Sequence, residues 1–574
     1  MSRLFLALAL LCPTPALAAE DLRARTGATV WDGTGADPIP DAVVLIEGDH
    51  IRAVGPRATV RIPKKATVED LSGAFIVPGL IDAHVHFFQT ASLYTRPDIF
   101  DGTALRPYAE DQQHARASLE GTFARYLASG VTAVVDVGGP FWNFEVRDLA
   151  RQGGAAPHVA VAGPLISTVS RPQLDLGDPP IIQAHDAEEA RALARAQLAR
   201  HPDLLKVWYI VDPEQGLEPG RPILEAVVAE GHAAGVRVMV HATELETARA
   251  AVTAGVDLLA HSIDDQPVDE AFLALLRERD VPLIGTLVVY EGYAEVLGQA
   301  VDLTPLEARL GDPWVRRTWS ELAVADLSDE ALAKNAARVE RLKARGPVMA
   351  ANLAAIQAAG LPVAAGTDAG NIGTLHGPSL HRELALMHAA GLSNRDVLLA
   401  ATRDAARIFA AEPDIGTLAP GMQADLLVLD ADPLQDLANL QRLRRVVLGG
   451  RDLEPAVLLP ADPATVVQAQ VEAYAARDLE AFLALYAEDA VLHRGLDDSD
   501  TVAGRATMRE IYGPLFTDSP GLRIAIAARE VLGGIVVDHE VVTGMRGNGP
   551  IQAIAIYEVR DGLIQQVWFA AREE

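Results

Sequence analysis

The chain has 574 residues, which predicts two to four domains, and it is 49% hydrophobic, enough to bury large cores. This composition excludes an intrinsically disordered protein. The net charge of −29 disfavours nucleic acids and anionic membranes as partners, because like charges repel.

Residues 1–18 have the pattern of a signal peptide. Arg3 supplies a positive charge, residues 4–11 form an apolar core, and Ala16 and Ala18 are the small residues of a cleavage site. The apolar core is too short to span a bilayer as a helix. The single cysteine, Cys12, lies in this segment, so a metal site of the mature protein must use other side chains. We expect an exported protein, periplasmic or secreted, with no membrane insertion after signal removal.

From residue 79 to about residue 409, apolar runs alternate with Ala-rich, charged stretches of helical character. Strands that alternate with helices pair in parallel, so eight such runs predict an α/β fold, a closed (β/α)8 barrel of the TIM type. The predicted strands are residues 74–81, 131–137, 158–162, 204–210, 236–241, 256–261, 281–287 and 361–367. Residues 291–360, between the last two strands, look helical and could form a lid or a partner surface.

Potential metal ligands stand at the ends of these predicted strands. His84 and His86 are two residues apart, so both side chains leave the strand on the same face. His241, His261 and Asp368 end or follow three other strands, and functional side chains of β/α barrels gather at the carboxyl ends of strands. Because these ligands outnumber those that one zinc ion needs, the sequence predicts two divalent metals, with zinc expected.

Lys206 lies in an otherwise apolar predicted strand, residues 204–210. A buried lysine loses its charge readily, and a neutral amine can capture carbon dioxide as a carbamate that would bridge both metals. The alternatives are a lysine that extends to solvent or one that pairs with a carboxylate such as Asp203. Spacing alone leaves these alternatives open.

Three further residues have interpretations from the sequence. Asp368 can act as a metal ligand and as a general base, with a helix N-cap as the alternative. Tyr209 follows Lys206 and is a candidate for substrate binding, although core packing is the more frequent role of such aromatics. His376 lies after the last predicted strand, where it could bind substrate or cap a helix.

Several segments resemble motifs of the amidohydrolase superfamily of metal-dependent hydrolases. They read GLIDAHVH at residues 79–86, HA at 241–242, HS at 261–262, GTDAG at 366–370 and GTLAPGMQADL at 416–426. The resemblance covers about residues 26–451 and is closest to the imidazolonepropionase- and prolidase-like branch. It implies a barrel at residues 79–412 and a small β-sandwich built from both flanks, residues 19–78 and 413–456.

The same resemblance implies the metal ligands. His84 and His86 would bind the more buried metal together with Asp368, and His241 and His261 would bind the other. A carboxylated Lys206 would bridge the two. Asp368 would also act as the general base.

Residues 462–574 form a separate unit after a proline-containing linker. They resemble the SnoaL-like fold, which is similar to nuclear transport factor 2: an α+β cone made of helices and a curled sheet. The predicted helices and strands are residues 466–476, 479–486 and 508–515, and residues 522–527, 534–542, 551–560 and 563–569. His493, Asp538 and His539 are its obvious acid–base candidates, but a binding or homodimerisation module is favoured over catalysis.

These observations predict an exported, metal-dependent amidohydrolase. It would use metal-activated hydroxide to cleave a carbon–nitrogen bond of a dipeptide, an N-acyl amino acid or a cyclic amide. One alternative is a mononuclear deaminase or imidazolone-type hydrolase in which Lys206 is idle. Another is a ligand-binding protein that acts through the C-terminal unit while the barrel is degenerate.

Overall fold

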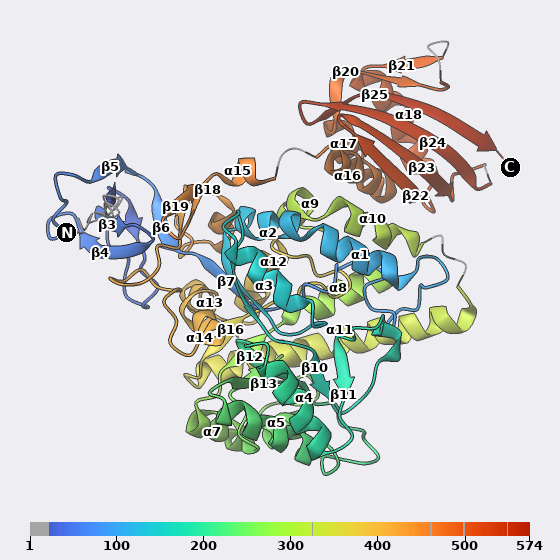
Figure 1. Ribbon diagram of the computed structural model, residues 1–574. Helices are drawn as coiled ribbons and strands as arrows, with labels where there is room; N and C mark the ends of the chain where they lie inside the picture. Colours follow the sequence, from blue (N-terminus) through green and yellow to red (C-terminus); the bar gives the residue numbers. More distant parts are fainter. Residues whose placement is uncertain are drawn as a thin grey trace, which may run out of the picture.

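The computed structural model describes residues 22–323, 325, 327–459, 462–496, 500–547 and 549–573. The predicted signal peptide lies outside the described residues. Three parts follow one another in space: a β-sandwich, a central barrel and a C-terminal α+β domain (Figure 1). In the described parts of the chain, no helix combines the length and the apolarity needed to cross a bilayer.

The β-sandwich contains two sheets, and both flanks of the barrel contribute strands to it. One sheet has the order β4-β3-β1-β5 and the other the order β19-β18-β17-β6-β2. Side chains such as Val44, Ile76 and Leu426 pack between them and are fully buried. The strands are β1 (Leu22–Thr26), β2 (Thr29–Val30), β3 (Ala42–Glu47), β4 (His50–Pro56), β5 (Thr67–Asp70), β6 (Phe75–Pro78), β17 (Leu426–Leu429), β18 (Leu443–Leu448) and β19 (Arg451–Leu453).

The central part is a closed barrel of parallel strands, which confirms the predicted (β/α)8 architecture. β7 pairs with β8 and β8 with β9, while β12 to β16 form a second parallel run. Two seams close the ring: the Asp203 amide donates to the Val161 carbonyl at 2.9 Å, and the Asp368 amide to the His84 carbonyl at 2.8 Å. The strands are β7 (Leu80–Val85), β8 (Val131–Asp136), β9 (His158–Val161), β12 (Leu204–Trp208), β13 (Arg237–His241), β14 (Leu258–Ala260), β15 (Leu283–Gly285) and β16 (Val363–Ala365).

Two short strands that the sequence pattern did not predict, β10 (Leu165–Ser167) and β11 (Ile181–Gln183), extend the sheet beside β12. Helices surround the strands, as Figure 1 shows. They are α1 (Tyr108–Ala117), α2 (Leu119–Ala128), α3 (Asn143–Arg151), α4 (Ala187–Leu198), α5 (Arg221–Ala233), α6 (Leu245–Thr253), α7 (Glu270–Arg279), α12 (Ser379–Ala389), α13 (Asn394–Ala400) and α14 (Arg403–Phe409), with 3-10 turns at Pro172–Leu174 and Leu437–Gln441.

The long interval between β15 and β16 is helical, as predicted, but it begins earlier than residue 291. It contains α8 (Leu287–Leu297), α9 (Pro305–Leu310), α10 (Pro313–Glu321) and α11 (Asp329–Ala358). The apolar run 281–287 therefore includes both a strand and the start of a helix. Burial alone does not distinguish these two states, because both are packed into the core.

The C-terminal domain is a sheet with helices against one face. Its strand order is β21-β20-β25-β24-β23-β22, and Phe482, Tyr486 and Tyr557 are buried between sheet and helices. Asp561 and Gly562 have φ of 53° and 74°, as a tight hairpin turn requires. The elements are α15 (Pro455–Leu458), α16 (Pro463–Ala476), α17 (Leu479–Ala484), α18 (Arg505–Asp518), β20 (Tyr486–His493), β21 (Thr501–Ala503), β22 (Arg523–Leu532), β23 (Ile535–Thr543), β24 (Ile551–Arg560) and β25 (Leu563–Glu573).

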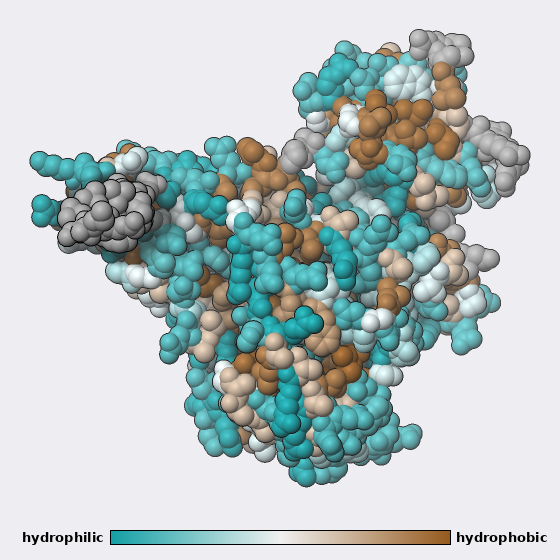
Figure 2. Space-filling model, viewed as in Figure 1, coloured by the Kyte–Doolittle hydropathy of each residue, from teal (hydrophilic) through white to brown (hydrophobic). Residues whose placement is uncertain are grey.

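The barrel insertion supplies the surface on which this domain docks. α10 contacts α16 and β22. The fully buried Arg316 of α10 donates from Nε to Oε1 of Glu472 at 3.0 Å. Figure 2 shows apolar side chains gathered on the face of the C-terminal domain turned to the viewer, and Ile554 of β24 is exposed. A homodimer through this domain stays a prediction.

Candidate metal centre and active-site cavity

Two histidines leave the carboxyl end of β7 in the direction that the two-residue period predicts. The His84 and His86 ring centroids lie 5.5 Å apart, and both side chains are buried. Nδ1 of His86 lies 2.7 Å from the carbonyl oxygen of Gly138, which accepts but cannot donate. The proton of a neutral His86 ring is therefore on Nδ1, and Nε2 presents a lone pair.

His241 and His261 approach from the opposite side of the barrel mouth. Their ring centroids lie 4.4 Å apart, and the His261 centroid is 4.7 Å from that of His84. Burial lowers the pKa of His84 and of His241 to about 3, and the charge of Lys206 adds to the effect. Burial also lowers the pKa of His261 well below its usual value. Neutral imidazole is the form that binds metal ions.

Asp368 follows β16 and points at the β7 histidines. Its Oδ1 lies 3.4 Å from Nε2 of His84 and 3.2 Å from Nε2 of His86. Burial opposes ionisation, but the facing histidines outweigh it and hold the pKa of Asp368 well below its usual range. The strands approach closely here because residue 366 is glycine: a Cβ on Gly366 would lie 2.9 Å from the Cβ of His84.

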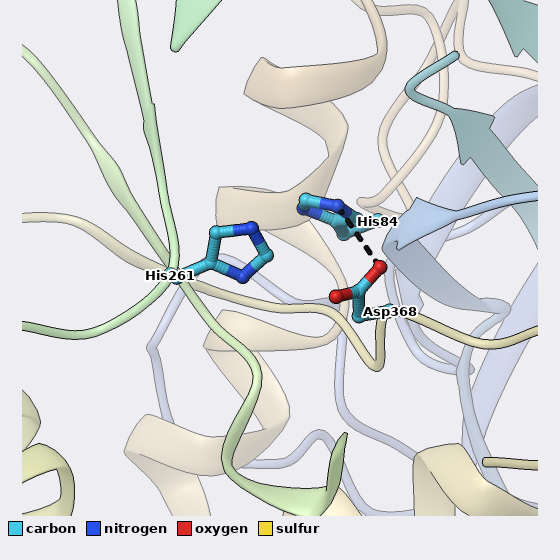
Figure 3. A group of neighbouring side chains, drawn as sticks. All are labelled: His84, His261 and Asp368. Atoms are coloured by element: carbon cyan, nitrogen blue, oxygen red, sulfur yellow. Dashed lines mark ion pairs between the residues drawn. The ribbon is translucent and has the colours of Figure 1, made fainter. Parts of the chain in front are cut away.

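This donor set fits a divalent cation. Nε2 of His84 and Nε2 of His86 converge on the same carboxylate oxygen of Asp368, at 3.4 and 3.2 Å, so the three atoms surround one point where a cation would be shared. In the described part of the chain, both ring nitrogens of His84 and Oδ1 of Asp368 are buried without a hydrogen-bond partner. Ligand atoms of His84, His261 and Asp368 lie within 4.8 Å of one another (Figure 3). Nitrogen and carboxylate ligands at this spacing are those that zinc prefers.

Lys206 is buried in β12, with 1% of its surface exposed. Its Nζ lies 3.5 Å from Sδ of Met239, and burial lowers its pKa to about 7. It does not extend to solvent, and Asp203 pairs with Arg147 at 2.8 Å instead. A lysine that extends to solvent and a pair with Asp203 are therefore both wrong, and a partly neutral lysine faces the same cavity as the histidines.

The predicted ligands share one cavity of about 240 Å³ at the barrel mouth. Helices α8 and α11 of the insertion close its other side with Tyr290, Tyr293 and Leu342. Its lining comprises His84, His86, Phe88, Gln89, Arg96, Ile99, Leu165, Ile181, Lys206, Trp208, His241, Thr243, His261, Val289, Tyr290, Tyr293, Arg338, Arg341, Leu342, Arg345, Asp368 and Asn371. The size suits a small substrate, and the mixed lining has a polar end at the histidines.

Two predicted substrate-binding residues are absent from this described lining, which corrects the sequence interpretation. The hydroxyl of Tyr209 donates to the Leu217 carbonyl at 3.0 Å, and the ring is 1% exposed. His376 donates from Nε2 to the His86 carbonyl at 3.1 Å and stacks on Phe87. Both residues pack and position the chain behind the site.

Sequence reasoning missed the polar residues that the insertion and the loop after β7 contribute. Arg96 donates to Oδ1 of Asn371 at 2.9 Å, and Tyr293 donates to the same oxygen at 2.7 Å. Arg338, Arg341 and Arg345 reach the cavity from α11. Their spacing of three and four residues was a signal for one helix face, but nothing in the sequence placed that helix over the mouth.

Comparison with known proteins identifies the class. The model of the amidohydrolase family matches residues 75–452, and that of the SnoaL-like domain matches residues 467–567. The chain therefore belongs to the amidohydrolase family, with a SnoaL-like domain at its carboxyl end. As a member of this family, it is a hydrolase that acts on carbon–nitrogen bonds, as the sequence predicted.

Individual relatives are distant. The chain is 26% identical over 391 residues to an uncharacterized protein of Mycobacterium tuberculosis, covering 67% of this chain and 86% of the relative. It is 24% identical over 444 residues to ochratoxinase of Aspergillus niger, covering 71% of this chain and 82% of the relative. A solved prolidase complexed with N-methylphosphonate-L-proline has a TM-score of 0.58 at 23% identity, over 75% of this chain and 99% of the other. This last likeness shows the fold.

Proposed function

We propose that the chain hydrolyses the amide bond of a dipeptide, an N-acyl amino acid or a cyclic amide with the help of two divalent metal ions. One observation carries the proposal: Nε2 of His84 and Nε2 of His86 converge on Oδ1 of Asp368, at 3.4 and 3.2 Å, in a buried site. Prolidase and ochratoxinase among the similar proteins support amide hydrolysis.

The side chains that would hold the metals are those of the candidate centre. His84, His86 and Asp368 would hold one ion, and His241 and His261 the other. Lys206, carboxylated, would bridge them, and its burial in the same cavity supports this role. Zinc is the expected metal. Bound there, the ions would activate water and polarise the scissile carbonyl.

The remaining steps fall to the chain itself. The Asp368 carboxylate would accept the proton of the attacking water and pass it to the leaving nitrogen. Its position is held by Thr367, whose hydroxyl donates to Oδ2 of Asp82 at 2.6 Å and ties β16 to β7. The carbonyl oxygen of Gly138 lies 2.7 Å from Nδ1 of His86 and orients that ring. The hydroxyl of Thr286 lies 2.9 Å from Nδ1 of His261 and does the same there.

Elemental analysis of the purified protein tests the metal assignment. We expect two equivalents per chain in the wild type and loss of one in Lys206→Ala. Lys343→Ala, an exposed lysine of α11 outside the cavity, is the control and should keep both. One equivalent in the wild type would favour the mononuclear alternative. Two equivalents of metal per chain in Lys206→Ala would rule out the bridging role of Lys206.

Activity provides the second test. A chelator should abolish hydrolysis of a dipeptide and acyl-amino-acid library, and added zinc or manganese should restore it. Activity in fully metal-free protein would refute the mechanism. Complete failure to bind metal would instead favour a ligand-binding protein that acts through the C-terminal domain.

We also propose that the protein is exported to the periplasm or secreted. The pattern of residues 1–18 supports this. Amino-terminal sequencing of the mature protein from fractionated cells tests it, with a start at Ala19 expected.

A further inference from the structure

The charge of the cavity is opposite to that of the whole chain. The chain has 78 acidic and 49 basic residues. Among the described residues that line the cavity, Asp368 is the single acid, whereas the basic members are Arg96, Lys206, Arg338, Arg341 and Arg345. A site with metal ligands at one end and guanidinium groups elsewhere attracts an anionic substrate.

Two of these arginines are already neutralised by the protein. Arg96 forms a two-fold contact with Asp98, with both N–O distances 2.7 Å. Arg345 donates to Oδ2 of the buried Asp264 at 2.9 Å. These two arginines therefore hold the walls in place and leave little charge for a ligand.

Arg338 and Arg341 are different. Arg338 donates to the neutral carbonyl of Ile99, and Arg341 has no hydrogen bond or ion pair within the described residues. Burial lowers the pKa of Arg338; the positive charges of Arg341 and Arg96 add to the effect, and Tyr293 and Asp98 oppose it. The two are three residues apart on α11, so they share one helix face. The charge of Asp98 acts on Arg338, but Asp98 already pairs with Arg96 and Arg171.

Apolar side chains line the cavity together with this pair and the candidate metal ligands. They include Ile99, Trp208, Val289 and Leu342. A ligand that fills the cavity would thus place an amide at the histidines, an apolar group against these walls and an anion at the arginines.

We propose that Arg338 and Arg341 form an anion subsite that binds a carboxylate of the substrate. The enzyme then acts on N-acyl amino acids or dipeptides, not on cyclic amides that lack an acidic group. The inference rests on the proposed amide hydrolysis and narrows its substrate class. Guanidinium groups bind carboxylates through paired, charge-assisted hydrogen bonds, which supply both affinity and orientation.

Matched substrate pairs test the subsite on the metal-loaded protein. Each N-acyl amino acid or dipeptide is compared with the analogue in which hydrogen replaces the carboxylate. We expect kcat/KM at least about tenfold higher for the acids, mostly through KM. Arg341→Gln should reduce this preference about tenfold while kcat changes little. It removes no hydrogen bond or ion pair within the described structure.

Lys343→Gln is the matched control, because it removes the same charge from the same helix outside the cavity. It should leave the preference unchanged. If Arg341→Gln and Lys343→Gln changed the preference equally, or if the neutral analogues were hydrolysed better than the acids, the anion subsite would be wrong. The proposed amide hydrolysis would still hold. Hydrolysis of neither member of any pair would count against the proposed function itself.

Binding without turnover gives an independent measure. Calorimetric titration of chelator-treated protein with N-benzoylglycine should show Kd about tenfold weaker in Arg341→Gln than in Lys343→Gln. The same Kd in both variants would contradict the subsite even if hydrolysis were found.

Discussion

The barrel mouth and the interior of the C-terminal domain both hold acidic side chains with little exposure to solvent, but the partners of these side chains differ. At the mouth, Asp368 faces histidine nitrogens, and its buried Oδ1 has no hydrogen-bond partner in the described structure. In the C-terminal domain, Arg529 holds both oxygens of the buried Asp538, at 2.7 and 2.6 Å. The hydroxyl of Tyr557 donates to Glu540 at 2.6 Å.

This difference distinguishes a ligand-binding site from side chains with a structural role. Buried polar groups cost stability unless they are paired, so an unpaired donor set indicates a ligand that the chain itself does not supply. A paired set needs nothing more. Asp538, an acid–base candidate from the sequence, is thus a structural residue. His539 lies on the other face of β23, where it is half-buried, and His493 stacks on Trp568 with centroids 4.9 Å apart.

The greatest contrast should come from removing one acid in each region. Asp368→Asn should lower kcat/KM about a thousandfold, because it removes a metal ligand and the general base together. Glu540→Gln is the counterpart in the C-terminal domain and should stay within about twofold of the wild type. Steady-state kinetics at saturating zinc measures both. Comparable losses in the two variants would erase the distinction between the regions.

For the free energy of unfolding, we expect the larger effect in the C-terminal domain. Asp538→Ala leaves Arg529, 6% exposed, without its carboxylate and should cost about 3–5 kcal/mol in the unfolding of the C-terminal domain. Glu530→Ala, an exposed acid next to Arg529 on β22, is the control and should be nearly neutral. Denaturant titration followed by tryptophan fluorescence measures the difference. Metal content of the barrel should not change in either variant.

The pH dependence of the C-terminal domain should sharpen the comparison. Burial raises the pKa of Glu540 from 4.5 to about 7, so between these values the folded state binds more protons than the unfolded one. Stability should therefore fall as pH rises through this window, by about 3 kcal/mol at most, and level off above it. Glu540→Gln should remove this slope. The same slope in the variant would assign it to another group.

The smallest effect is expected at Tyr209, behind the site. Tyr209→Phe removes the hydrogen bond to the Leu217 carbonyl and should cost about 1 kcal/mol of stability. Because the ring does not line the cavity, kcat/KM should change less than about twofold. A selective rise in KM would restore Tyr209 as a substrate-binding residue.

Much of the candidate centre could be predicted from local pattern. His84 and His86 follow the two-residue period of a strand, and the other ligands stand where predicted strands end. Prediction was weaker where elements are short. β10 and β11 contain three residues each, too few to show a period. The strand β20 was missed because residues 479–486 continue the helical pattern to Tyr486, where the strand begins.

From the order of amino acids, the barrel and the residues that meet at its mouth could be inferred, and the resemblance to the amidohydrolase superfamily implied the flanking sandwich. Period and strand-end position are local properties, and parallel pairing then brings the strand ends together. Only the folded chain decided that α11 brings Arg338 and Arg341 to the cavity, that Tyr209 turns away from it, and which buried acids are paired. Those outcomes depend on contacts between segments far apart in the chain, and no local pattern encodes which segments will touch.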